Sequence, residues 1–228
     1  MKKKKSESAV KLLDVTRLRF AVEVEVEFPK AQDSSDLISR HRLIPGWEMD
    51  FDGSLDNGAE YRPRKSNHLY YNQETLTQLK EILALIRVHE GRVNSNCGLH
   101  IHINCKGFTD REVLTIIQEF VHKQRYIVNK FKVHSVRLKD TCKLLPKKNL
   151  YQLSVKQIHH YRALTQDWNF SQYNYFSDKY YSLNITHLSK GDYGTLEFRL
   201  FNATLNYSDL KDRILWTLKF IKSCIERD

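Results

Sequence analysis

Three pairs of side chains in this sequence have types and spacing suited to metal and phosphate chemistry. They are Glu23 with Glu25, His100 with His102, and Glu197 with Arg199. Residues two apart on a β-strand point to the same face, with side chains roughly 6 to 7 Å apart. Carboxylates are natural ligands of Mg²⁺ or Mn²⁺, and an arginine stabilises charge on a transferred phosphoryl group. If the three strands share one sheet, the pattern predicts a catalytic site on one face of that sheet that binds metal and polyphosphate.

Each pair also has an ordinary structural interpretation. Glu23, Glu25 and Glu27 fit the polar face of an edge strand, which is the usual meaning of such a row. The two histidines fit a surface pair or one satisfied core histidine, and the glutamate–arginine pair fits a cross-strand salt bridge. Three acids in one row repel each other, however, so the row is easier to understand if cations lie over it.

A zinc site is a rival interpretation of the histidine pair, because Cys97 and Cys105 flank it. In a regular strand both cysteines fall on the face opposite the histidines, although Gly98 could break that regularity. The sequence has no CxxC pair to support zinc. Four cysteines in 228 residues do not form a disulfide scaffold, so we expect free thiols and a cytoplasmic location.

The hydrophobic patterning predicts strands alternating irregularly with helices. Strands are expected at 18–28, 47–51, 59–62, 92–104, 181–187 and 195–201, and the last two would pair as a hairpin. Helices are expected at 74–87, from Thr109, where Glu112 completes a capping box, and at 209–225. The order favours an α+β fold with an antiparallel sheet and helices on one face.

Length and composition indicate one domain with its own core. The chain has 228 residues, of which 41% are hydrophobic. It has no run of apolar residues long enough to span a membrane. Residues 1–14 are expected to form a disordered basic tail without a secretory signal, and residues 15–228 a single catalytic domain.

The net charge of +10 is concentrated in two segments. Residues 2–5 are all lysine, and segment 123–148 holds nine basic residues against one acid. Such patches attract nucleic acid, nucleotides or anionic substrates, although they also occur as plain solvated surface. Between 151 and 181 lie nine aromatic residues, which fit either a substrate lid or core packing.

Seven segments, in order along nearly the whole chain, resemble motifs of the amidoligase family. They are 20–25 (an ExE strand), 47–54 (W…DGS), Glu60, 97–104 (CGLHxH), 135–142, 179–184 and 195–206 (TxEFR…TLN). Ala21, Lys179 and Ala203 depart from the usual residues of that pattern. The resemblance implies a glutamine synthetase-like catalytic fold, a curved and mainly antiparallel sheet with helices packed on one face.

The resemblance also implies an activity, cofactors and site residues. The activity is an ATP-dependent carboxylate–amine ligase that works through an acyl phosphate with two divalent ions, Mg²⁺ or Mn²⁺. The implied metal ligands are Glu25 and Glu60 for one ion and Glu23, His100 and Glu197 for the other. Implied catalytic residues are Arg199, His102 and Glu197, and implied nucleotide contacts are Arg137, His102 and Asn184.

Partners and alternatives follow from the same residues. The expected partners are a carboxylate and an amine, with a peptide or protein among the acceptors that fit, and no membrane. The alternative functions are a metal-dependent hydrolase or nuclease, and a basic nucleic-acid-binding domain that uses segments 123–148 and 168–181. A requirement for ATP distinguishes the ligase from the nuclease, because a nuclease degrades polynucleotide without ATP.

Overall fold

The computed structural model describes residues 14–29, 44–64, 69–150, 153–163, 179–189 and 194–226. One sheet runs through this part of the chain in the strand order β2-β3-β1-β5-β7-β6, with β4 paired to the end of β1. All of these strand pairs are antiparallel. The strands are β1 (Arg19–Glu27), β2 (Trp47–Asp52), β3 (Gly58–Pro63), β4 (Leu69–Tyr70), β5 (Gly98–Asn104), β6 (Leu183–Asn184) and β7 (Thr195–Asn202). The α+β expectation is therefore confirmed.

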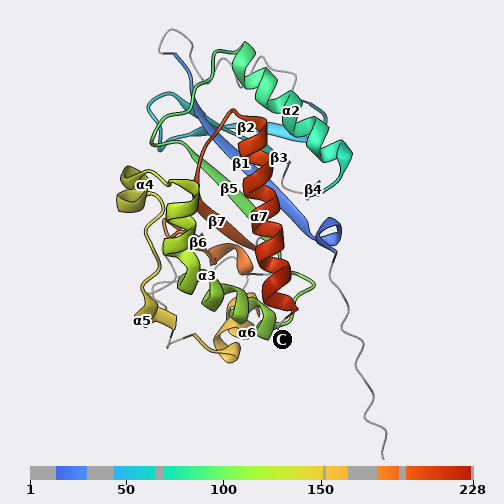
Figure 1. Cartoon of the computed structure of the whole chain (residues 1–228), viewed down its shortest axis with the longest axis vertical. Helices are drawn as coiled ribbons and strands as arrows, with labels where there is room; N and C mark the ends of the chain where they lie inside the picture. Colours follow the sequence, from blue (N-terminus) through green and yellow to red (C-terminus); the bar gives the residue numbers. More distant parts are fainter. Residues whose placement is uncertain are drawn as a thin grey trace, which may run out of the picture.

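The helices include three long ones that cover one face of the sheet (Figure 1). The α-helices are α2 (Gln73–Val88), α3 (Asp110–Phe131), α4 (Ser135–Asp140), α5 (Lys147–Leu150), α6 (Val155–Ala163) and α7 (Tyr207–Ile225). Short 3-10 turns are η1 (Val15–Arg17) and η3 (Thr186–Leu188). Helices α3 and α7 pack side by side over the middle of the sheet, and α2 covers the end formed by β2 and β3.

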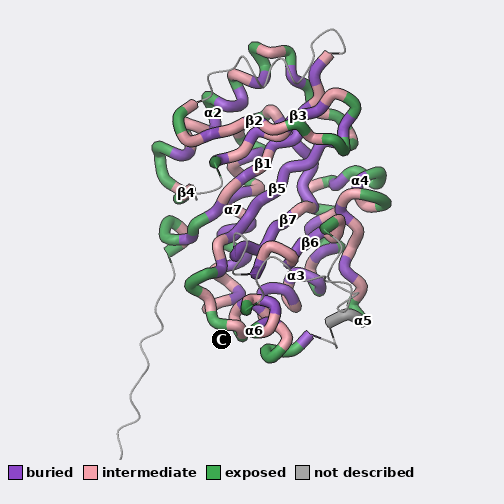
Figure 2. The backbone as a smooth tube through the Cα atoms, turned by 180° about the vertical axis from the view of Figure 1, so that it is seen from behind, coloured by how far each residue is buried: buried purple, intermediate pink, exposed green. Residues whose placement is uncertain are grey.

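The period-two pattern of β1 decides which face is covered. Val22, Val24 and Val26 are fully buried under the helices, while the glutamates between them point to the other face. On β7, Phe198 contacts Phe120 of α3 edge-on at 5.3 Å between ring centroids. Seen from behind, β1, β5 and β7 cross the centre of the molecule as a largely buried stretch (Figure 2). The acidic face is thus opposite α3 and α7.

Most predicted elements are confirmed, including the hairpin and the capping box. Leu183 pairs with Phe198 across the β6–β7 hairpin. The Thr109 side chain accepts from the Glu112 backbone, and the Glu112 carboxylate accepts from Thr109. No helix in the described residues is long and apolar enough to cross a membrane. Residues 190–193 of the hairpin connection and most of the aromatic segment 151–181 lie outside the described residues, as does the tail at 1–13.

The strand predicted at 181–187 is wrong in its length. Extended pairing ends at Asn184, because Ile185 leaves the extended conformation with φ −108° and ψ 1°. The Asn184 carboxamide oxygen then accepts bonds from the Thr186 N–H at 2.9 Å and hydroxyl at 2.8 Å, which stabilises the turn η3. Helices α4 and α6 were not predicted, since so few of their residues are buried that no helical stripe is visible.

A buried glutamine connects α3 to the segment that follows α4. Gln124 donates to the Leu145 carbonyl at 2.7 Å and accepts from the Leu145 N–H at 2.9 Å. Gln124→Leu leaves both backbone groups unpaired, so we expect a loss of about 3 kcal/mol of unfolding free energy. Urea denaturation measures it, with the half-buried Gln118→Leu on the same helix as control. Equal losses in the two variants would contradict this role.

Candidate active site

The strand register brings the predicted pairs onto one face of the sheet. Glu23 on β1 is opposite His100 on β5, and His102 is opposite Glu197 on β7. Two further pairings extend the row in both directions, Asn184 with Glu197 and Glu25 with Glu60. Residues from five strands therefore meet on the face that α3 and α7 leave free.

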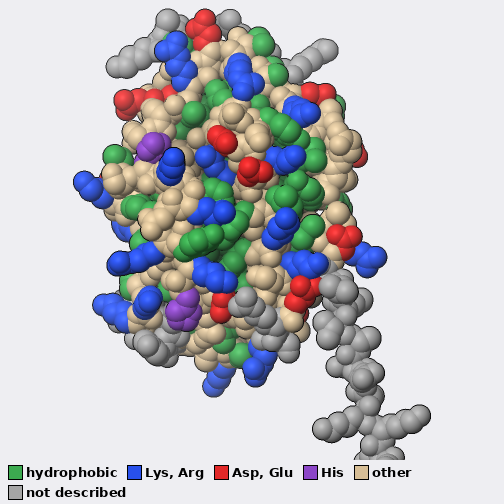
Figure 3. All heavy atoms as spheres, in the orientation of Figure 1, with side chains coloured by type: hydrophobic (Ala, Val, Ile, Leu, Met, Phe, Trp, Pro, Cys, Tyr) green, Lys and Arg blue, Asp and Glu red, His purple; other side chains and the backbone are tan. Residues whose placement is uncertain are grey.

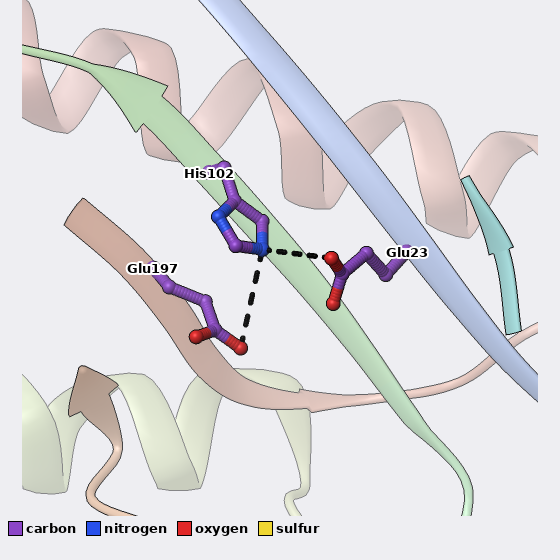
Figure 4. Close-up of side chains that lie close together, drawn as sticks. All are labelled: Glu23, His102 and Glu197. Carbon is purple, nitrogen blue, oxygen red and sulfur yellow. Dashed lines mark ion pairs between the residues drawn. The ribbon is translucent and has the colours of Figure 1, made fainter. Parts of the chain in front are cut away.

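Glu23, His102 and Glu197 form a group in this row that could hold a metal ion (Figure 4). One ligand atom from each lies within 4.8 Å of the others. His102 Nε2 is 3.2 Å from Glu23 Oε1 and 4.0 Å from Glu197 Oε1. On its other side, His102 Nδ1 is 3.2 Å from the Thr195 hydroxyl. A ring that donates from Nδ1 to Thr195 presents its Nε2 lone pair to the space between the two carboxylates.

His100 lies among three carboxylates. Its Nδ1 is 3.2 Å from Glu23 Oε2 and 3.3 Å from Glu197 Oε1, and its Nε2 is 3.0 Å from Glu25 Oε1. Burial and the nearby Arg199 would lower the pKa of His100, but Glu25 and Glu23 outweigh them and raise it to about 9. A protonated His100 thus offsets part of the negative charge of the acid row.

Glu25 is held by its own set of donors. Its carboxylate accepts from the Gly98 N–H and lies 3.6 Å from Arg137 Nη1. Burial alone would raise the pKa of Glu25, but His100, Arg137 and the Gly98 N–H lower it to about 2. The strand end around Gly98 therefore keeps this carboxylate ionised inside the protein.

Arg137 has no exposed side-chain surface in this structure. Its guanidinium donates to the Asn96 carbonyl at 2.9 Å and the Arg199 carbonyl at 2.8 Å. A Cβ on Gly98 would come within 2.4 Å of both Nη atoms, so glycine is what lets the guanidinium pass under β5. The predicted nucleotide contact of Arg137 remains a prediction, and the geometry favours a positioning role through Glu25.

Glu197 is surrounded by groups that favour its charged form. Arg199 pairs with Oε1, Asn184 donates to Oε2 at 2.6 Å, and His187 Nε2 lies 3.5 Å from Oε2. Burial opposes ionisation, yet Arg199 and His102 hold the pKa of Glu197 far below its ordinary value. Asn184 is itself almost fully buried, so it orients Glu197.

His187 and Thr195 were missed as site residues by sequence reasoning. His187 comes from η3, and its ring lies 5.7 Å from that of His102. The strand predicted through residue 187 did not include the break at Ile185. It therefore did not indicate that the His187 side chain lies next to Glu197. Thr195 shares strand parity with Glu197, which was a usable signal.

Glu60 lies to one side of the central group, beside Arg62. The Arg62 guanidinium contacts Glu60, Asp50 and Glu48, the last at 2.8 Å. Burial and the charge of Glu23 raise the pKa of Glu60 to about 7, against the opposing effect of Arg62. Glu25 and Glu60 were predicted to share an ion. That stays a prediction: each has an arginine neighbour, and among the described residues they do not join the group of Glu23, His102 and Glu197.

The donor set fits a divalent cation. Among the described residues, His102 Nε2 is buried without a hydrogen bond, although Glu23 Oε1 lies 3.2 Å away. Buried polar atoms are normally paired, and an ion would satisfy nitrogens and carboxylates together. The zinc alternative gains nothing, because among the described residues neither Cys97 nor Cys105 joins the group of possible metal ligands.

Comparison with known proteins adds one match. A family model described as "Putative amidoligase enzyme" matches residues 42–221. That range contains β2, β3, β5, β6 and β7, and hence His100, His102 and Glu197. Strand β1 precedes it, so the register of β1 against β5 is what brings Glu23 and Glu25 to the site. No curated protein matches the chain.

Proposed function

The chain belongs to the putative amidoligase family, and on this premise we propose that it is an ATP-dependent carboxylate–amine ligase with a glutamine synthetase-like catalytic fold. The observation that carries the proposal is the largely buried acid–histidine group on the face of the sheet opposite α3 and α7. Such a group suits a reaction that must neutralise the phosphates of ATP next to a substrate carboxylate.

The reaction has two steps. An oxygen of the substrate carboxylate attacks the γ-phosphorus of ATP, which breaks the bond to the bridging oxygen and releases ADP. An amine nitrogen then attacks the carbonyl carbon of the acyl phosphate, phosphate leaves, and the amine loses a proton as the amide bond forms. A bound Mg²⁺ or Mn²⁺ would supply Lewis-acid charge neutralisation on the phosphate oxygens.

The position of each residue in the site indicates its role in the proposed reaction. Glu23, His102 and Glu197 would hold the ion, with Thr195 fixing the orientation of the His102 ring. Arg199, whose side chain is 12% exposed, is held by Glu197 and would stabilise charge on the transferred phosphoryl group. His100, among the three carboxylates, would keep them at a fixed separation.

Loss of one carboxylate should weaken metal binding sharply. Glu23→Gln replaces one carboxylate oxygen by an NH2 group and removes the negative charge, so we expect at least tenfold weaker Mn²⁺ binding. Electron paramagnetic resonance or calorimetric titration measures this in the full chain. Glu27→Gln is the matched control, since Glu27 belongs to the same strand but is bonded to Asn94 at 2.6 Å.

The two glutamate variants separate a specific site from general acidity. Equal Mn²⁺ affinity in Glu23→Gln and wild type would contradict the assigned ligand. In the same preparations, ADP formation that requires both a carboxylate and an amine from a substrate panel supports the ligase. Polynucleotide degradation without ATP would instead support a nuclease.

A further inference from the structure

We propose that the outer surface of α3 and α7 binds single-stranded nucleic acid. This surface is on the side of the molecule opposite the acidic face, and the proposal does not depend on the ligase activity. It consists of two adjoining hollows of about 620 and 410 Å³ that share Trp216 and Lys219. Together we call them the groove along the two helices.

The groove combines cations with aromatic rings. Its basic residues are Lys123, Lys130, Lys132, Arg213 and Lys219, its acids are Asp209 and Asp212, and its aromatic residues are Tyr126, Phe131, Trp216 and Phe220. Figure 3, which looks onto α3 and α7, shows hydrophobic side chains running between Lys and Arg side chains on this face. The excess of positive charge favours a polyanion.

The rings are arranged as a platform. Trp216 and Phe220 are stacked with centroids 5.4 Å apart and planes at 5°, and Phe131 meets Trp216 edge-on at 5.6 Å. Tyr126 is 57% exposed, although most aromatic side chains bury more of their surface. An exposed ring beside a fixed stack can accept a nucleobase on its face without any rearrangement of the core.

Lysines border the rings and are close enough to bind phosphate next to a stacked base. Lys130 Nζ lies 6.0 Å from the Tyr126 ring centroid and 5.7 Å from that of Phe131. Lys123 Nζ lies 5.6 Å from the Phe220 ring centroid and also pairs with Glu119 at 3.2 Å. Lys123 and Lys130 are separated by about 10 Å along α3, two helical turns. Both are on the helix that covers the apolar face, so they are far from the metal ligands on the other face.

This chemistry favours nucleic acid over other occupants. A second copy of the chain would bring the same lysines against these, and like charges repel. An acidic peptide supplies carboxylates but no base to stack on Tyr126, whereas single-stranded nucleic acid supplies both phosphate and π-face. The basic segment 123–148 thus contributes its α3 lysines here and Arg137 to the core.

The test is anisotropy of a fluorescent 12-nucleotide RNA of mixed sequence, titrated with the full chain at several salt concentrations. Lys130→Glu with Lys219→Glu should reduce the magnitude of the slope of log K against log[salt] by about 1.4 and weaken binding at least tenfold. The control is Lys139→Glu with Lys156→Glu, which makes the same charge change at exposed positions of α4 and α6. Equal weakening by the control would overturn the proposal.

Tyr126 provides the second, independent readout. Tyr126→Leu should weaken RNA binding about tenfold, whereas Tyr126→Phe should retain it, because stacking needs only the ring. Circular dichroism checks that both variants are folded. Absence of RNA binding at 50 mM salt would overturn the assignment. So would binding to polyglutamate or anionic lipid vesicles that is as strong as RNA binding and is unchanged by Tyr126→Leu.

Discussion

Arg199→Ala is expected to lower ATP-dependent ligation by on the order of 10³-fold. Arg199 is the cation that Glu197 holds at the edge of the acid–histidine group, with Nη1 3.4 Å from His100 Nδ1. In the proposed reaction it stabilises charge that develops as the phosphoryl group moves, so kcat should fall more than KM for ATP changes. The measurement is coupled detection of ADP in a panel of carboxylates and amines.

Two controls make the Arg199 result interpretable. Arg199→Lys keeps the charge but not the bidentate geometry, so it should recover only part of the activity. Retained Mn²⁺ binding by Arg199→Ala would show that the metal ligands are still in place. ADP formation within tenfold of wild type would rule out a role for Arg199 in the transition state.

Arg137→Met is expected to remove about 3 to 5 kcal/mol of unfolding free energy, because it leaves the Glu25 charge buried without its arginine. The variant also leaves the Asn96 and Arg199 carbonyls without their donor. Gly98→Ala should be destabilising through the same contact, since its Cβ would displace the guanidinium. Urea denaturation of both variants measures the effect.

Arg125→Met is the control for Arg137, because Arg125 is exposed on α3. It should change stability by less than about 0.5 kcal/mol. If Arg137→Met were as stable as Arg125→Met, the buried guanidinium would not be a structural partner of Glu25. Its predicted contact with nucleotide would then be the better explanation of its presence.

Strand parity is the reason that much of the site could be predicted from sequence. Glu23 and Glu25, and likewise His100 and His102, are two residues apart, and a period of two places each pair on one face whatever the tertiary context. The register between two paired strands cannot be predicted from the sequence of either strand alone. It decides that both histidines come close to Glu23 and Glu197, and that His100 also reaches Glu25.

The residues that were missed or placed differently depend on backbone breaks and long-range contacts. His187 reaches Glu197 because Ile185 ends β6 two residues earlier, and no local pattern announces that turn. The family resemblance implied that Arg137 contacts nucleotide, and nothing in its local sequence indicates that its side chain is fully buried. Its burial depends on the space under Gly98, more than 35 residues away along the sequence, and hydrophobic periodicity cannot reveal it.

The most direct test is calorimetric titration of a non-hydrolysable ATP analogue with Mg²⁺ or Mn²⁺ into wild type and Glu197→Gln. Glu197 belongs to the proposed metal ligands and also holds Arg199 and accepts from Asn184. We predict that analogue binding requires the divalent ion and is lost in the folded Glu197→Gln variant. Metal-independent binding, or equal binding by wild type and variant, would contradict the proposal that ATP binds on the acidic face of this sheet.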